Sequence, residues 1–165
     1  MLPKSKTELD AIRDECKSMV TTRASLSGAA AIVPIPGADV GADITLLLEM
    51  IPSINRKFGL SSDQIDDLDP KLKQLIFVTV TSIGSQMVGK AITKQLIMQV
   101  LKRIGIRIAA KSLTKWIPIV GQAAAATISF GAMKLVGNSH VDDCYHVALK
   151  AIEATQELST EPVVA

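Results

Sequence analysis

The spacing of apolar residues constrains the fold of this chain most, because they recur at intervals of three and four along almost the whole sequence. Such spacing places apolar side chains on one face of an α-helix. It predicts helices over about residues 7–31, 39–59, 71–117, 122–136 and 139–158. Aromatic residues make up only 3% of the chain. Because strands favour aromatic and β-branched residues, this composition argues against a β-sandwich or barrel.

Two similar segments interrupt the helical pattern. Pro34-Ile35-Pro36-Gly37 and Pro118-Ile119-Val120-Gly121 both match Pro-Ile-x-Gly-x4-Ala, at an offset of 84 residues. Each follows an apolar helix and precedes a helix rich in small residues, so each predicts a corner that breaks the helix. Nothing else aligns well at that offset, so duplication and convergent use of a good corner stay equally open.

These patterns together predict an all-α fold. We expect a compact bundle of about six to eight helices with two Pro/Gly helix-break-helix corners. A chain of 165 residues can bury one sizeable core. We therefore expect a single helical domain over residues 1–158 and a disordered C-terminal tail over residues 159–165.

Individual residues predict where helices begin and end. Gly59 is expected to end the second helix, with Leu60 making the hydrophobic contact that accompanies a C-terminal glycine. Asp69 and Pro70 predict an N-cap and a first helical residue. The other predicted joints or stops are Gly84, Gly89, Gly105 and the pair Gly137-Asn138.

The cysteine content and the first residues bear on the compartment. Cys16 and Cys144 are the only cysteines, too few for a disulfide framework. The first six residues lack the apolar core of a signal peptide. These features predict a cytoplasmic protein with two reduced, buried thiols.

Charge is distributed unevenly along the chain. Residues 1–70 carry 7 Lys or Arg against 11 Asp or Glu, whereas residues 71–165 carry 11 against 5. From Lys71 to Val141 there are ten basic residues and no acidic one. Such asymmetry points to an anionic partner, either lipid headgroups or nucleic acid.

The basic residues concentrate in one amphipathic segment that ends at Trp116. Aliphatic residues between them predict a helix with one cationic and one apolar face, a pattern typical of membrane-surface binding. Nucleic acid is disfavoured, because no aromatic stacking residue precedes Trp116 and no recognition motif is present. A solvated charged face on an ordinary core helix remains an equal alternative. The predicted membrane-binding residues are Lys90, Lys94, Lys102, Arg103, Arg107, Lys111, Lys115 and Trp116.

The longest uncharged run follows directly, over residues 116–133. Its 18 residues fall short of the roughly 20 needed to span a bilayer, and Pro118 and Gly121 weaken it further. It suits a buried or shallowly inserted hairpin arm better than a membrane span.

A glycine-rich segment partly matches a nucleotide-binding motif. Residues 84–91, Gly-Ser-Gln-Met-Val-Gly-Lys-Ala, contain Gly-x4-Gly-Lys. Ala91 stands where a P-loop has its magnesium-binding Ser or Thr. We therefore favour a Gly-containing helix interior over a small nucleotide-binding protein that uses Gly89 and Lys90.

The segment 140–146 contains the ligand types of a zinc site, including His140 and Cys144 one turn apart. Only two or three of these groups can share a helix face, so a fourth ligand would have to come from Cys16 or an isolated carboxylate. An acidic helix N-terminus with a half-buried cysteine explains the same residues. We predict neither a metal site nor a Cys–His nucleophile.

Asp39 and Asp43 lie one turn apart in an otherwise uncharged stretch. Paired carboxylates in apolar surroundings can carry raised pKa values and transfer protons. No second catalytic group is close in sequence, so we favour a role at the helix N-terminus, with Asp39 as the N-cap. We predict no catalytic residue and no cofactor.

Several of these motifs together resemble a known family. The similar segments look like the helical domain that follows the G domain in immunity-related, interferon-inducible GTPases. They are residues 30–39, 42–50 and 58–60, and residues 117–121 with 129–131. They equally resemble a bacterial domain of unknown function attached to GTPases and membrane proteins. The similarity covers roughly residues 10–155. The candidate structural signature is Pro34, Gly37, Asp39, Asp43, Pro118 and Gly121.

This resemblance implies an all-helical fold and, in the GTPase relatives, membrane association and the relay of nucleotide state. The chain lacks a G domain, so neither GTP hydrolysis nor a catalytic residue is carried over. Two hypotheses follow. The chain is a non-enzymatic module that binds anionic membranes peripherally through its basic face, or it is a stand-alone partner of a separately encoded GTPase or an effector or immunity component.

Overall fold

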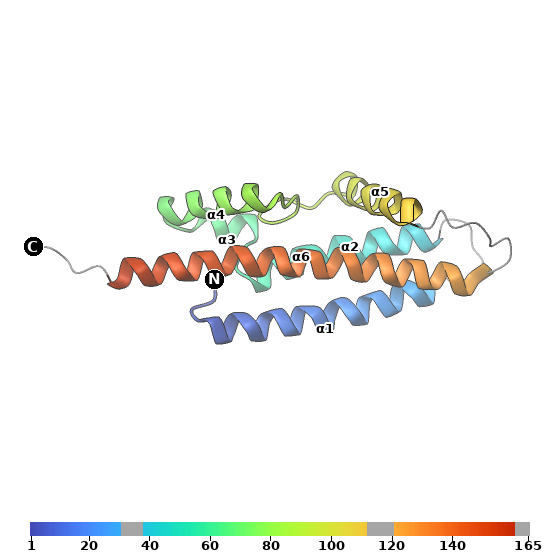
Figure 1. Ribbon diagram of the computed structural model, residues 1–165, viewed down its shortest axis with the longest axis horizontal. Coiled ribbons are helices and arrows are strands. Elements are labelled where there is room, and N and C mark those ends of the chain that lie inside the picture. The colour runs from blue at the N-terminus through green and yellow to red at the C-terminus, as the bar shows by residue number, and fades with distance from the viewer. Residues whose placement is uncertain (31–37, 112–120, 161–165) are drawn as a thin grey trace, which may run out of the picture. The chain divides into compact units, whose positions relative to one another are not determined.

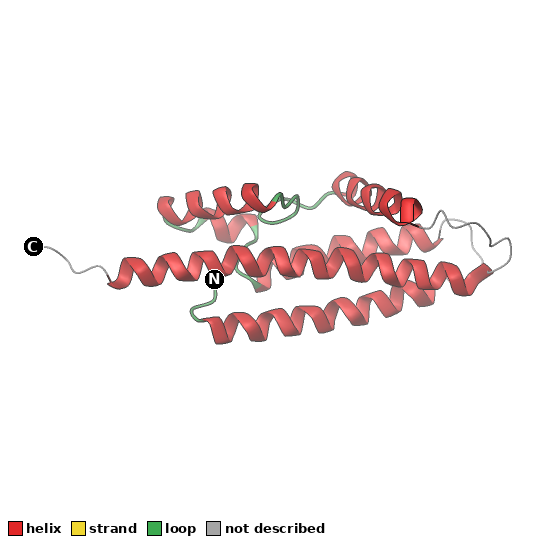
Figure 2. Cartoon of the chain, in the orientation of Figure 1, coloured by secondary structure: helices red, strands yellow, loops and turns green. Residues whose placement is uncertain are grey.

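The computed structural model describes the backbone of residues 1–30, 38–111 and 121–160, and the side chains of residues 1–27, 43–103 and 130–157. Within these ranges Figure 2 shows only helices and loops, which confirms the predicted all-α fold for this part of the chain. The helices, labelled in Figure 1, are α1 (Lys6–Ala30), α2 (Ala38–Lys57), α3 (Ser62–Asp66), α4 (Pro70–Ile83), α5 (Lys94–Lys111) and α6 (Gly121–Thr160).

The chain divides into two compact units. The first unit comprises Met1–Cys16, Pro52–Ala91 and His140–Ala165, and the second comprises Lys17–Ile51 and Ile92–Ser139. Helices α1, α2 and α6 contribute residues to both. Each unit is therefore assembled from segments that are far apart in the sequence.

The first unit is held together by an apolar core and by polar contacts at its edge. The Tyr145 hydroxyl of α6 donates to the Asp10 carboxylate of α1 (2.7 Å), and Lys57 pairs with Glu15 (2.6 Å). Cys16 and Cys144 are buried free thiols, as predicted. The largest fully buried apolar side chains of this unit are Leu9, Ile54, Phe58, Leu60 and Ile76.

Helix ends in the first unit follow the local sequence. The Asp69 carboxylate accepts hydrogen bonds from the backbone N–H groups of Lys71 and Leu72 (both 3.0 Å), so it is the N-cap of α4. Gly84 adopts a left-handed conformation (φ 68°) and ends α4. Gly59 (φ 71°) follows α2 in the same conformation, as predicted.

In the second unit, the predicted helix end at Gly137-Asn138 is wrong, because α6 runs without a break from Gly121 to Thr160. A Cβ atom on Gly137 would lie 2.6 Å from Val20 Cγ1 and 3.0 Å from Met50 Cε. Gly137 therefore allows α1 and α2 to approach α6 closely, and it does not end a helix. The buried apolar side chains of this unit are Val20, Ala24, Ile44, Leu47, Met50, Ile51, Ile97, Met133 and Val136.

Two further predictions of helix boundaries are wrong. Gly105, predicted as a joint, lies inside α5, since a single glycine costs a helix only about 1 kcal/mol. Asp39, predicted as the N-cap, is the second residue of α2, which begins at Ala38. The propensity of a single residue is a weak predictor of where a helix begins or breaks.

Candidate functional site

Helix α5 carries most of the described part of the predicted basic face. Lys94, Lys102 and Arg103 are exposed, whereas Ile97 is fully buried. Met98 is 39% exposed and lies one turn from both Lys94 and Lys102. The exposed side of α5 therefore combines positive charge with an apolar side chain.

The remaining residues of the predicted basic face are only partly described. Lys90 is exposed and lies in the loop before α5. Arg107 and Lys111 belong to α5, but their side chains are outside the described set. Lys115 and Trp116 lie outside the described residues.

The residues of the two predicted corners fall mostly outside the description. Pro34, Gly37 and Pro118 are outside the described residues. Asp39 and Gly121 are helical residues of α2 and α6, but nothing beyond their backbone is described. The two corners therefore stay a prediction.

Asp43 has a structural partner in the second unit. Its carboxylate accepts a hydrogen bond from the Ser27 hydroxyl, which joins α2 to α1. Farther along the same two helices, Arg23 of α1 forms a salt bridge with Glu49 of α2 (2.7 Å). Asp43 is thus used to join two helices, and no described histidine or cysteine accompanies it in these contacts.

The segment Gly84–Lys90 is a loop, which corrects the predicted helix interior. Three of its backbone N–H groups form hydrogen bonds within the protein. The Gly84 and Ser85 N–H groups donate back to α4, and Lys90 N–H donates to Met87 within the loop. The loop follows a helix, whereas a P-loop follows a strand.

The structure explains why residue 89 is a glycine. Its φ is +68°, and a Cβ atom there would lie 2.7 Å from Ile65 Cδ1 of α3. The glycine therefore serves a left-handed backbone and a close approach to α3. The glycine at position 89 is thus explained by packing, without a bound nucleotide.

A buried polar cluster occupies the middle of the first unit. The Asn55 amide nitrogen donates to the carbonyl of Met87 (3.0 Å), which turns the amide oxygen toward α6. That oxygen accepts a hydrogen bond from His140 Nε2 (3.0 Å) and one from the Cys144 thiol (3.4 Å). Asn55 is 2% exposed, and His140 and Cys144 are fully buried.

Sequence reasoning noticed His140 and Cys144 but missed Asn55. Its signal is an amide on the apolar face of α2, between Ile54 and Phe58, where a polar side chain needs a buried partner. The cluster therefore joins α2, α6 and the loop after α4 by hydrogen bonds.

The cluster has the chemistry of a core hydrogen-bond network. Burial raises the pKa of the Cys144 thiol well above its usual range, with Asp143 and Cys16 adding to the shift. A thiol that keeps its proton is a poor nucleophile and a poor metal ligand. Among the described side chains, no three His, Cys, Asp or Glu residues gather as a metal site would require.

The buried thiols predict a pH dependence of stability. Burial raises the pKa of Cys16 from 9.0 to about 11. Below pH 9 both folded and unfolded chains keep this proton, and above it the unfolded chain loses the proton first, so stability falls as the pH rises toward 11. We expect urea unfolding to show this fall, and a shallower one in Cys16→Ala. Parallel pH profiles for the two proteins would contradict the assignment.

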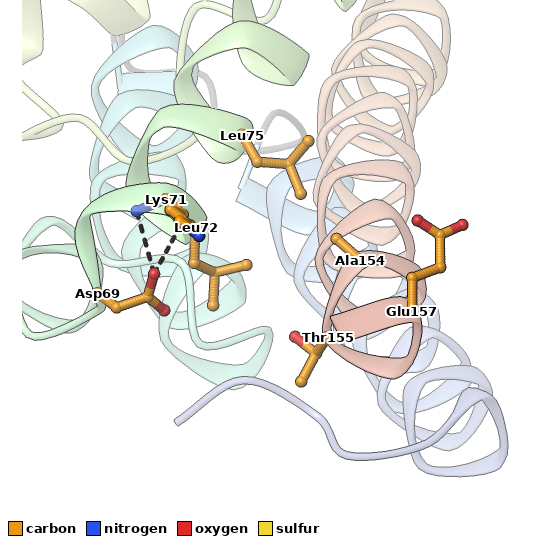
Figure 3. A pocket seen from close by; sticks show the side chains of 7 residues that line it. All are labelled: Asp69, Lys71, Leu72, Leu75, Ala154, Thr155 and Glu157. Carbon is orange, nitrogen blue, oxygen red and sulfur yellow. Dashed lines mark hydrogen bonds between the residues drawn. The ribbon is translucent and has the colours of Figure 1, made fainter. Parts of the chain in front are cut away.

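A pocket of about 450 Å³ lies between α4 and the last turns of α6 (Figure 3). Leu72, Leu75 and Ala154 form its apolar wall, while Asp69 already caps α4. A second pocket of about 320 Å³ shares Leu72 with it. Neither lining contains a histidine, a cysteine or a serine, and the hydroxyl of Thr155, which lines both pockets, donates to the Ala151 carbonyl. The described walls therefore offer space for an apolar group.

These observations leave the exposed basic side of α5 as the candidate functional surface. Within the described residues, no helix has both the length and the hydropathy needed to cross a membrane.

We compared the chain with family models, curated proteins and solved structures. No family model matches it, and no significant match was found among the curated proteins or the solved structures.

Proposed function

We propose that this chain is a non-enzymatic helical module that binds anionic membranes peripherally through its basic face. The observation that carries the proposal is the exposure of Lys94, Lys102 and Arg103 on α5, where Met98 is 39% exposed. Lys90, in the loop that precedes α5 in the sequence, is exposed as well. No acidic residue occurs between Lys71 and Val141, so no carboxylate in this stretch offsets their charge. Basic side chains near an anionic leaflet each contribute about 1 kcal/mol.

The proposal extends to finer features of the chain. The protein is a cytoplasmic bundle of about six to eight helices with two Pro/Gly corners, and Arg107, Lys111, Lys115 and Trp116 extend the basic face. In this proposal the chain resembles the helical domain of immunity-related GTPases in function as well as in sequence. Membrane recruitment is then its role. The alternative is a stand-alone partner of a separately encoded GTPase, or an effector or immunity component.

Charge reversal on α5 tests the proposal. The variant Lys94→Glu/Lys102→Glu/Arg103→Glu is expected to bind anionic vesicles at least about a hundredfold more weakly, because three attractive charges become repulsive. Flotation with phosphatidylserine-containing vesicles measures the bound fraction. The substitutions lie on exposed positions, so circular dichroism is expected to show an unchanged helical fold.

A matched control separates local from total charge. Lys4, Arg56 and Lys150 are also exposed and belong to other segments, so Lys4→Glu/Arg56→Glu/Lys150→Glu gives the same net charge. This control is expected to lose much less binding than the α5 variant. Equal losses would mean that net charge, not the basic face, controls binding. If the wild type and both variants bind the vesicles equally well, the proposal is wrong and the partner-protein hypothesis remains.

A further inference from the structure

Helix α4 presents an unusual outer face. Phe77 and Val78 are adjacent and are 56% and 60% exposed, whereas α1, α5 and α6 each show one isolated large apolar side chain among the described residues. Ile76 and Val80 are buried on the opposite side. We define the α4 outer face by its exposed side chains at helical spacing, Lys71, Gln74, Phe77, Val78 and Thr81.

The two threonine hydroxyls described on this helix already have partners within it. The Thr81 hydroxyl donates to the Phe77 carbonyl and the Thr79 hydroxyl to the Leu75 carbonyl, both at 2.8 Å. Asp69 caps the first turn and Gly84 ends the last. Covering the centre of the α4 outer face with apolar material therefore leaves neither hydroxyl hydrogen without an acceptor.

Charge on the α4 outer face has a single sign. Lys71 lies at its N-terminal end, Lys73 is the next charged residue, and no further charge follows until Lys90. An apolar surface with a cation at its edge matches the boundary between acyl chains and anionic headgroups. Because no acidic residue occurs from Lys71 to Val141, the charge of the whole stretch favours the same partner.

We propose that the α4 outer face inserts Phe77 and Val78 into the acyl boundary of an anionic membrane, with Lys71 at the headgroups. This inference rests on the proposed function and adds a second, apolar contact to it. The α5 charges give the salt-sensitive part of binding, and the α4 outer face gives a part that persists at high salt. Burying two apolar side chains in lipid strengthens partitioning by about tenfold or more.

An environment-sensitive label tests this inference directly. Cys16 and Cys144 are buried, so a thiol-reactive nitrobenzoxadiazole is directed to the exposed thiol of Val78→Cys. We expect a blue shift and a rise in emission on addition of phosphatidylserine-containing vesicles. Leu135→Cys is the matched control, since Leu135 is similarly exposed (54%) but is a lone apolar residue on α6, and its label is expected to stay in water.

A second variant measures the contribution to binding. Phe77→Ser/Val78→Ser is expected to lower flotation at high salt by about tenfold while the wild-type salt dependence is retained. Wild-type flotation without a Val78 label response, or with equal responses at both labels, would overturn the inference and leave the proposed function standing. No wild-type flotation would overturn both. A blue shift without vesicles that grows with protein concentration would assign the face to a second copy of the chain.

Discussion

Replacing Gly137 by leucine is expected to lower the free energy of unfolding by about 2–3 kcal/mol, because the new side chain has no space against Val20 and Met50. Val20 is β-branched and cannot rotate away easily, so α1 would have to shift. The better helix propensity of leucine recovers only about 1 kcal/mol of this loss. Urea unfolding followed by circular dichroism measures the change.

Gly131 provides the matched control in the same helix. A Cβ atom there would have no atom within 4 Å, so Gly131→Ala is expected to stabilise the protein by about 1 kcal/mol through helix propensity alone. The two substitutions therefore have opposite expected signs. A loss at both positions of similar size would contradict the close packing inferred at Gly137.

Replacing Asn55 by leucine is expected to cost about 3 kcal/mol. The amide of Asn55 serves the Met87 carbonyl, His140 Nε2 and the Cys144 thiol, and all three lose this buried partner at once. Each lost partner of a buried polar group costs about 1–3 kcal/mol, partly offset by the apolar replacement. Urea unfolding again measures the loss.

A double-mutant cycle with His140→Leu isolates the contact between Asn55 and His140. Removing both polar groups leaves fewer of them without a partner, so the double variant is expected to lose less stability than the sum of the single variants. Strict additivity would mean that the 3.0 Å contact contributes nothing of its own. A raised reactivity of Cys144 toward thiol reagents in Asn55→Leu would report the same loosening of the cluster.

Much of the fold could be predicted from local sequence. The periodicity of apolar residues gives α1 and α2 nearly to the residue, and Gly59, Asp69 and Gly84 act as helix ends where their chemistry predicts. At Gly137 the same reasoning predicts a helix end that the structure does not have. A glycine that ends a helix and a glycine that admits a neighbouring helix look alike in sequence, and only the partners Val20 and Met50 distinguish them.

The candidate sites were predictable to different degrees. Charge patterning alone identifies Lys94, Lys102 and Arg103, because exposed charges need no partner. Asn55 could not be found this way, since its role depends on His140 and Cys144, which are 85 and 89 residues away in the chain. The outer face of α4 could not be predicted either, because Phe and Val are residue types that are usually buried in a core.

Flotation of the wild-type protein on vesicles of increasing phosphatidylserine content tests the central claim most directly. Membrane binding through the basic face predicts that the bound fraction rises steeply with anionic lipid and falls as salt is raised from about 0.05 to 0.5 M, as the Debye length shortens. Equal recovery on neutral and anionic vesicles, or recovery that salt does not change, would contradict it.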